Sequence, residues 1–249
     1  MIDYYNKKQL RSRATKIRHQ YIQNHDTIKL DNKIYSNICT LLKNLAITKY
    51  ISCSSSNTII STYHSILGEP NLKFIDTNHY TSTFYLKNQN ITQSYNLLLP
   101  VVLNNNKMVF TKFMHKKDCI SNQYNILEPN LSLYSKYNKL QSKIELSKMI
   151  EAFENYKNGI LHGNISNVKM YIDFIPQICI VPGVCFNHQK YRVGMGKGYY
   201  DRYLSTYKSH VKLKIGVCYD SQIINFDNKI MSKYDALMDY IVTDRQIIF

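Results

Sequence analysis

The chain has 249 residues, of which 44% are hydrophobic, so it can bury a sizeable core and is not a disordered tail protein. No apolar run approaches the roughly 20 residues that a membrane-spanning helix needs, and we expect no secretory signal because the N-terminus is charged. The net charge of +15 indicates an anionic partner, such as nucleic acid, a nucleotide or an acidic metabolite, or else simply a solvated lysine-rich surface.

The N-terminal segment from residue 4 to residue 24 is polar and basic, and the near-helical spacing of Leu10, Ile17 and Tyr21 predicts a first helix. Residues 7–19 contain no acidic side chain, so they also resemble an organellar transit peptide. We expect a cytoplasmic protein instead, because these residues fit a site described below. A second helix is predicted by an amphipathic stripe of Leu30, Ile34, Ile38, Leu41, Leu42 and Leu45.

Short apolar runs follow, each of strand length and bounded by Gly, Pro, Asn or Asp. They predict strands at residues 58–63, 97–102, 108–113, 178–181, 214–218 and 240–242. Several runs are apolar on both faces, which is typical of central strands in a sheet that is covered on both sides. Helical stretches between the strands favour α/β layering over a sandwich.

The stretch between Pro129 and Asp173 is polar and lysine-rich, and a loop of this length is uncommon unless it carries structure of its own. We therefore predict an extra helical insertion at about residues 131–168. Its helix, over 140–157, would end before Gly159. The apolar stripe of this helix consists of Leu140, Ile144, Met149, Ile150, Phe153 and Tyr156.

The cysteines are scattered, with no C-x-x-C pair and no histidine at zinc-ligand spacing. We expect them to be reduced and to serve as small hydrophobic residues rather than as a zinc site. They are Cys39, Cys53, Cys119, Cys179, Cys185 and Cys218.

A glycine-rich turn carries the chemistry that the sequence suggests. Gly194, Gly196 and Gly198 alternate just before a predicted helix that starts at about Tyr199. Glycines let backbone N–H groups approach an oxyanion, the helix N-terminus adds partial positive charge, and Lys197 supplies a full one. The turn is neither a phosphate-binding loop of the Walker type nor a dinucleotide fingerprint. By the glycines alone, it could also be a turn without function.

The residues around this turn make it specific, because they resemble the signature of 5-formyltetrahydrofolate cyclo-ligases, also called methenyltetrahydrofolate synthetases. That signature is Pro-Gly-x-x-Phe followed by Arg-Leu-Gly-x-Gly-(Gly or Lys)-Gly-Tyr-Tyr-Asp. Here Tyr191 replaces the usual glycine before the arginine, and Val193 replaces the leucine. The matching residues are Pro182, Gly183, Phe186, Arg192, Gly194, Gly196, Lys197, Gly198, Tyr199, Tyr200 and Asp201.

The resemblance continues outside the turn and covers nearly the whole chain in order, most weakly over 131–172. Lys7 to Arg11 is similar to the family's N-terminal Lys-x-x-Leu-Arg, and residues 63–69 are similar to the segment that ends in its folate-binding glutamate. Taken singly, each piece has a structural alternative. Lys7 and Arg11 could form an exposed helix face, Glu69 could lie in a solvated turn, Asp235 could cap a helix, and His64 could simply be packed. The remaining pieces are Leu99-Pro100, Met108 and Phe110, Ile126 to Pro129, and Asp235 with Asp239.

The resemblance implies a single domain over residues 1–249 with a three-layer, Rossmann-like α/β fold around a largely parallel sheet. It implies conversion of 5-formyltetrahydrofolate, with or without a polyglutamate tail, to 5,10-methenyltetrahydrofolate by a monomer that uses ATP and Mg²⁺. Lys197 and Tyr199 would be catalytic, and Asp201 and Asp235 would bind the metal. ATP would contact Lys7, Arg11, Arg192, Gly194, Met195, Gly196, Lys197, Gly198, Tyr199 and Tyr200. Folate would contact His64, Glu69, Met195, Gly196, Lys197, Gly198 and Tyr199.

Two other functions stay open at this stage. The charge of +15 and the 22 tyrosines would suit a nucleic-acid-binding module that reuses the fold, since basic grooves with aromatic platforms bind single strands. A different ATP-dependent ligase or kinase could also use the same scaffold. Lys197, Asp201 and Asp235 argue against a pure binding module, which would not need them. We expect neither a nucleic-acid partner nor a membrane partner.

Overall fold

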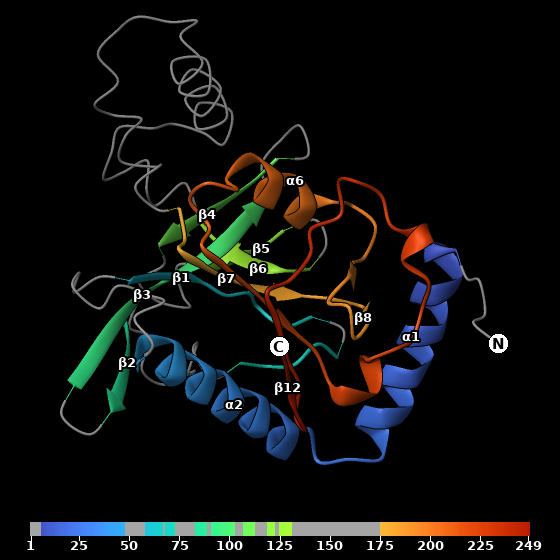
Figure 1. The fold of residues 1–249 in the computed structure, drawn as a ribbon, viewed down its shortest axis with the longest axis horizontal. Helices are drawn as coiled ribbons and strands as arrows, with labels where there is room; N and C mark the ends of the chain where they lie inside the picture. Colours follow the sequence, from blue (N-terminus) through green and yellow to red (C-terminus); the bar gives the residue numbers. More distant parts are fainter. Residues whose placement is uncertain are drawn as a thin grey trace, which may run out of the picture.

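A computed structural model of the chain describes residues 6–47, 58–66, 68–72, 83–88, 91–102, 107–112, 119–122, 125–130 and 175–249. The helical insertion predicted at 131–168 lies outside these residues. The described chain is built on an eight-stranded sheet of order β12-β11-β10-β7-β1-β3-β2, with β4 also pairing with β3 (Figure 1).

The two predicted N-terminal helices are confirmed. Helix α1 spans Lys7–Gln23 and begins at a capping box, in which the Asn6 side chain accepts from Gln9 N at 2.9 Å and the Gln9 side chain accepts from Asn6 N at 3.2 Å. Helix α2 spans Thr27–Ile47 and buries the whole predicted apolar stripe. Within the described residues, no helix combines the length and the apolarity that crossing a membrane would require.

The sheet is largely parallel, as predicted. Its centre consists of parallel strands, namely β11 (Tyr240–Val242), β10 (Leu213–Val217), β7 (Ile178–Pro182), β1 (Thr58–Ser61) and β3 (Ile91–Val102). The antiparallel strands are peripheral, namely β12 (Ile247–Ile248), β2 (Thr83–Asn88) and β4 (Met108–Lys112). The predicted α/β class therefore holds, with antiparallel additions at the margins.

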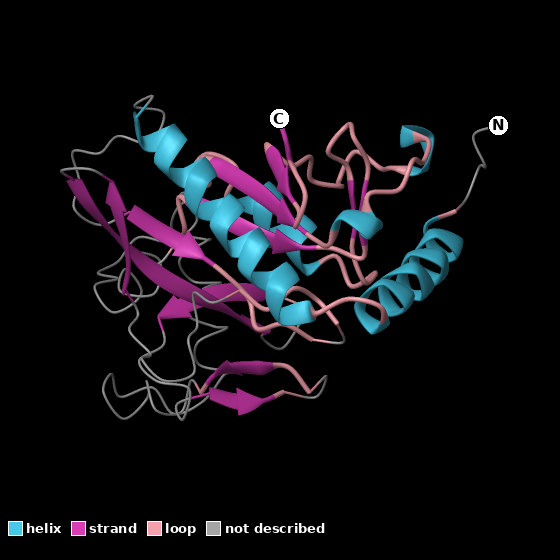
Figure 2. Ribbon diagram, turned by 90° about the horizontal axis from the view of Figure 1, so that it is seen from below, coloured by secondary structure: helices cyan, strands magenta, loops and turns pink. Residues whose placement is uncertain are grey.

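Alternate residues of β7 show that the sheet is covered on both faces. Ile178 and Ile180 pack in the cluster that contains the apolar stripe of α2, whereas Cys179 and Val181 pack in the cluster that contains α6 (Tyr199–Thr206). Figure 1 accordingly places α2 and α6 on opposite sides of the sheet, and Figure 2 shows α2 lying across the strands. The predicted three-layer arrangement is confirmed.

Two small hairpins were not predicted. They pair β5 (Cys119–Ser121) with β6 (Leu127–Pro129) and β8 (Cys185–Phe186) with β9 (Arg192–Val193). The β8–β9 hairpin, together with Phe226, forms a third apolar cluster with Leu10 and Ala14 of α1. This packing sets α1 beside the segment that leads into α6. The chain also contains the 3₁₀ turns η4 (Asp220–Gln222) and η5 (Asn228–Ile230).

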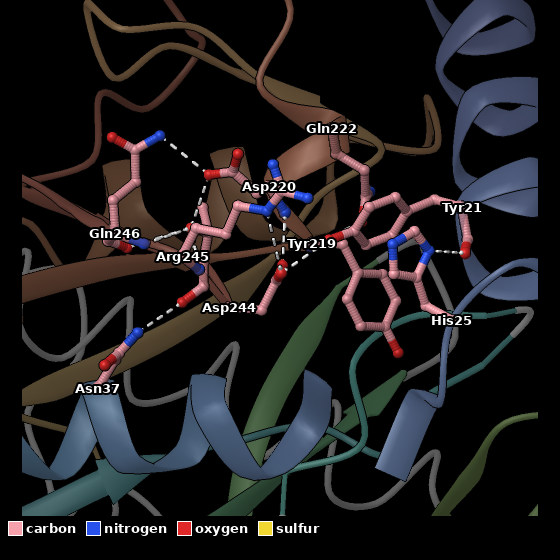
Figure 3. A network of polar contacts seen from close by, with 10 residues as sticks. Tyr21, His25, Asn37, Tyr219, Asp220, Gln222, Asp244, Arg245 and Gln246 are labelled. Carbon is pink, nitrogen blue, oxygen red and sulfur yellow. Dashed lines mark hydrogen bonds and ion pairs between the residues drawn. The ribbon is translucent and has the colours of Figure 1, made fainter. Parts of the chain in front are cut away.

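The C-terminal end of α1 is tied to the sheet by a polar network (Figure 3). Tyr21 Oη donates to Asp244 Oδ2 at 2.8 Å, and Asp220 N donates to Asp244 Oδ1 at 2.7 Å. The Thr243 carbonyl accepts from Asn37 Nδ2 of α2 at 2.9 Å. The two N-terminal helices are thus attached to the turn that joins β11 to β12.

Candidate functional site

A cavity of about 490 Å³ opens between α1, the segment after β1, the β5–β6 hairpin and the turn that leads into α6. Every residue that the sequence predicted for the site lines this cavity. These residues are Lys7, Arg11, His64, Glu69, Arg192, Gly194, Met195, Gly196, Lys197, Gly198, Tyr199, Tyr200, Asp201 and Asp235. Segments nearly the whole chain apart in sequence therefore meet at one place.

The glycine-rich turn between β9 and α6 has the backbone that an anion site requires. Gly196 has φ +101° and Gly198 has φ +66°, so both occupy the left-handed region that side chains disfavour. Gly198 is the N-cap of α6 and offers no side-chain acceptor to the N–H groups of the first turn. Those N–H groups, with the helix dipole behind them, can bind an oxyanion. Met195 and Lys197 are exposed in the same turn.

Arg192 braces the turn from inside. Its side chain is only 5% exposed and donates to Asp201 Oδ2 at 2.8 Å and to the Pro182 carbonyl at 3.1 Å. Its guanidinium lies 5.6 Å from the ring centroid of Tyr200. A Cβ on Gly194 would come within 2.6 Å of Arg192 Nη1, so this glycine is needed for close approach. Arg192 lines the cavity, but these contacts are with Asp201, Pro182 and Tyr200 of the protein itself.

Helix α1 supplies two further cations to the cavity. Arg11 Nε donates to the Gly194 carbonyl at 2.7 Å, and its guanidinium lies 3.3 Å from where a Cβ of Gly196 would sit. Lys7 Nζ contacts Asp235 Oδ2 at 2.5 Å. Because Lys7 and Arg11 are four residues apart, they lie on the same face of the helix. The turn and α1 together bring cationic side chains to one side of the cavity.

The two predicted metal carboxylates lie close together through the chain around residue 235. Asp201 Oδ1 accepts from Ala236 N at 3.3 Å, and Asp235 Oδ2 accepts from Ser232 N at 2.5 Å and from Ser232 Oγ at 2.8 Å. Burial works against the ionisation of Asp235, but the bonds from Lys7 and Ser232 outweigh it and lower the pKa of this carboxyl. Over the described residues there is no group of three or more acidic, histidine or cysteine side chains at metal-binding range.

Glu69 is a carboxylate in a different environment. Its Oε2 accepts from Ile66 N at 3.3 Å, and no cation lies within ion-pair distance in the described parts of the chain. Burial raises the pKa of Glu69 to about 7, against the opposing effects of the Ile66 N–H and of the charges on Arg18 and Arg192. This group can therefore exchange a proton near neutral pH.

Aromatic side chains form part of the wall. Tyr199 lies with its ring 5.4 Å from the Arg202 guanidinium carbon, and Tyr200 packs edge-on against Phe110 at 6.2 Å between ring centroids. The Tyr200 hydroxyl is buried and has no hydrogen-bond partner among the described residues. Tyr63 donates to the Pro70 carbonyl at 3.0 Å. The rings offer flat apolar surface for a planar ligand.

Comparison with known proteins finds similarity to one family. Residues 162–244 match the model of the 5-formyltetrahydrofolate cyclo-ligase family. A probable 5-formyltetrahydrofolate cyclo-ligase of Schizosaccharomyces pombe is 36% identical over 117 residues, which cover 42% of this chain and 57% of that protein. The mitochondrial 5-formyltetrahydrofolate cyclo-ligase of Arabidopsis thaliana is 26% identical over 207 residues, covering 80% of this chain and 59% of that protein.

Over these stretches the chain is similar to the 5-formyltetrahydrofolate cyclo-ligases. Its matches span less than two thirds of the length of either relative. The solved structure of the Aquifex aeolicus 5,10-methenyltetrahydrofolate synthetase shares its fold with a TM-score of 0.52 and 22% identity, covering 97% of this chain and 91% of that one. The predicted resemblance and the predicted fold are both confirmed.

The cavity has a further lining residue that the sequence analysis did not assign to the site. Glu128 of the β5–β6 hairpin is 1% exposed, and its Oε2 accepts from Val102 N and from Asn122 Nδ2, both at 3.1 Å. Glu128 and Asn122 line the cavity. Residues 126–129 had been noted only as part of a pattern. The available signal was a carboxylate between apolar neighbours, which is costly to bury without donors.

Proposed function

We propose that this chain is a single cyclo-ligase domain that converts 5-formyltetrahydrofolate and ATP to 5,10-methenyltetrahydrofolate, ADP and phosphate. The observation that carries the proposal is the convergence of an anion-binding turn, the cations of α1 and a buried carboxylate on one cavity. A nucleoside triphosphate needs the turn and the cations, and a pterin with N–H donors can bind the carboxylate. The folate tail is anionic, so part of the net positive charge of the chain can bind it.

The chemistry explains why positioning is enough. A formyl group on nitrogen is a poor electrophile, and its oxygen is a poor leaving group. Transfer of the γ-phosphoryl group of ATP to that oxygen releases ADP and converts the oxygen into a phosphate ester. N10 of the folate then attacks the same carbon, the C–O bond breaks, and phosphate leaves as N10 loses its proton. No nucleophile from the protein is required, so the catalytic demand is orientation and charge neutralisation.

We assign the neutralisation to the cations that face the cavity. Lys7 and Arg11 would contact the phosphates from α1, and Lys197 would follow the transferred group from the turn. The N–H groups of the first turn of α6 would donate hydrogen bonds to the phosphate oxygens. Arg192 would contribute its charge from behind the turn while keeping the turn in shape. In this scheme Met195, Gly194 and Tyr200 contact ATP mainly by forming the surface on which it lies.

The carboxylates fit a magnesium ion that shares phosphate oxygens. Asp235 Oδ1 has no donor within the described residues, whereas both oxygens of Asp201 already accept from Arg192 and Ala236. Asp235 could therefore bind the ion directly, and Asp201 could accept from a water of its shell. Mg²⁺ commonly keeps several waters and takes only one or two carboxylates. When bound, it would neutralise charge on the transferred phosphoryl group.

Glu69 would accept from the N–H donors of the pterin, with Tyr199 and His64 beside the ring and the Gly196–Gly198 backbone beneath the reacting group. A carboxylate that is partly desolvated before the ligand arrives makes a stronger hydrogen bond than an exposed one. Tyr199 also stands at the N-terminus of α6, so it can lie between the folate and the transferred phosphoryl group. We propose that the protein acts as a monomer in the cytoplasm.

The test is to incubate the purified chain with 5-formyltetrahydrofolate, ATP and Mg²⁺ and to follow the ultraviolet absorbance of the methenyl product. Product should require all three components and should form far more slowly in Lys197→Ala. It should persist in Lys208→Ala, a matched control that removes an exposed lysine outside the cavity. ADP release without methenyl product would indicate another ATP-dependent ligase or kinase. Binding to single-stranded nucleic acid without turnover would indicate the binding module.

A further inference from the structure

Helix α1 carries a third cation on the face that bears Lys7 and Arg11. Arg18 follows these residues at positions i+11 and i+7, so the three side chains lie within about 40° around the helix axis. Unlike the other two, Arg18 is 6% exposed and is not part of the cavity wall. Arginine is rarely buried without a partner, so the burial of Arg18 requires an explanation.

The surroundings of Arg18 lead to the loop that holds Glu69. Arg18 Nε is buried and has no hydrogen-bond acceptor within the part of the chain that is described. It lies 3.8 Å from where a Cβ of Gly68, the residue before Glu69, would sit. Burial lowers the pKa of the Arg18 guanidinium, and the negative charge of Glu69 acts most strongly against this, ahead of Tyr219 and Tyr63.

We propose that Arg18 is a positioning residue for Glu69: it packs against the loop at Gly68 and favours the ionised form of the Glu69 carboxylate, which accepts hydrogen bonds from the pterin of the substrate. This assignment rests on the proposed function, because it takes Glu69 as the folate contact. With this assignment, α1 would act on the folate as well as on the phosphates of ATP.

The groups that face Glu69 from each packed element support Arg18 as its main counter-charge. Arg192 approaches from β9, but it is already paired with Asp201 at 2.8 Å. Tyr63 and Tyr200 approach from the end of β1 and from α6, and burial raises the pKa of both phenols well above the ordinary value, so they are neutral near pH 7. Arg18 is the facing cation that no described carboxylate neutralises.

The experiment compares the pH dependence of kcat/KM for 5-formyltetrahydrofolate in the wild type, Arg18→Gln, Arg18→Met and Arg18→Lys. In the wild type, kcat/KM should fall on the acid side with a midpoint near the pKa of Glu69, about 7. Loss of the cation should move this midpoint up by about one pH unit, which is a loss of roughly tenfold below the midpoint. The difference in kcat/KM between these variants and the wild type should vanish at high pH. Arg18→Lys should keep the wild-type midpoint.

Lys16→Gln is the matched control, because it removes an exposed cation from the same helix and should leave the profile unchanged. KM for ATP at saturating folate should change little in the Arg18 variants. A loss of kcat/KM that is equal at all pH values would mean that Arg18 only packs. An acid limb that persists in Glu69→Gln would mean that another group titrates, and either result overturns the proposal.

A measurement without turnover separates this proposal from the proposed function. The difference in free energy of unfolding between Glu69→Gln and its parent is followed against pH, once with Arg18 and once with Arg18→Met. Removal of the arginine should move the pH at which this difference levels off upward by about one unit. If the wild type makes no methenyl product but this shift is found, the proposed function fails and the positioning role stands. Identical curves would refute the positioning role.

Discussion

Replacing Glu69 by glutamine should stabilise the folded protein at high pH, although it removes a polar site residue. The reason is that burial raises the pKa of Glu69 from an ordinary 4.5 to about 7. As pH rises between these two values, the unfolded chain releases the Glu69 proton while the folded chain retains it. Stability that is fully present below pH 4.5 is therefore lost as the pH rises through about 7. Glutamine does not titrate, so the variant escapes this loss.

The magnitude follows from the same two values. A difference from 4.5 to about 7 corresponds to an upper limit of about 3 kcal/mol, at about 1.4 kcal/mol for each pH unit. Glu69 retains some solvent contact, and charge on a partly exposed group is screened, so about 1–2 kcal/mol is the realistic gain. At pH 4 to 5 the wild type and Glu69→Gln should be close to equal, and the gap should open toward pH 8.

The assay is denaturant unfolding of both proteins at closely spaced pH values, with the difference in unfolding free energy plotted against pH. All other titrating groups are common to the two proteins and cancel in that difference. A difference that is constant with pH would show that Glu69 titrates normally. A variant that becomes less stable than the wild type as pH rises would show that the carboxylate is stabilised as an anion, and the reasoning from burial would be wrong.

Three further predictions concern the phosphate side. Lys197→Ala should lower kcat on the order of 10²–10³-fold with little change in folate affinity, and near-normal turnover in steady-state assays would remove Lys197 from the site. Asp201→Asn and Asp235→Asn should each raise the Mg²⁺ concentration at half-maximal rate, less than additively when combined; unchanged dependence in Asp235→Asn would place the metal elsewhere. Gly196→Ala should cost about 1–3 kcal/mol in thermal unfolding and weaken ATP binding, because φ is +101° and the Cβ meets Arg11; wild-type stability would contradict this.

The structural features that could be predicted from sequence are those determined by residues close together along the chain. The stripe from Leu30 to Leu45 repeats at helical spacing, so it predicted α2 without knowledge of its partner strands. The run from Ile178 to Val181 is apolar on both faces, so it predicted a central strand. The glycine-rich turn could be recognised because its glycines, Lys197 and the helix that follows are contiguous in the sequence.

The features that could not be predicted depend on distant partners. The first half of β3 and all of β2 form a long antiparallel pair, although the sequence of 91–96 shows no apolar run, because the neighbouring strand supplies the backbone hydrogen bonds. The β8 and β9 strands have only two residues each, below the length that any periodicity can reveal. The roles of Glu128 and Arg18 are set by partners outside their own elements, so in sequence Arg18 resembled one more charge on a basic helix.

Under the proposed function, the placement of α1 brings one helix into contact with both substrates. Its C-terminal part is fixed by Tyr21, which donates to Asp244 in the network of Figure 3. Its N-terminal part reaches the turn through Arg11 and Asp235 through Lys7. Lys7 and Arg18 are separated by about 16 Å along the helix, at 1.5 Å for each residue. A helix of this length cannot shift at its phosphate end without moving the charge that faces Glu69. Because coupling between two binding sites is reciprocal, the proposed function predicts that a displacement of α1 that improves phosphate contact alters folate affinity, and the reverse.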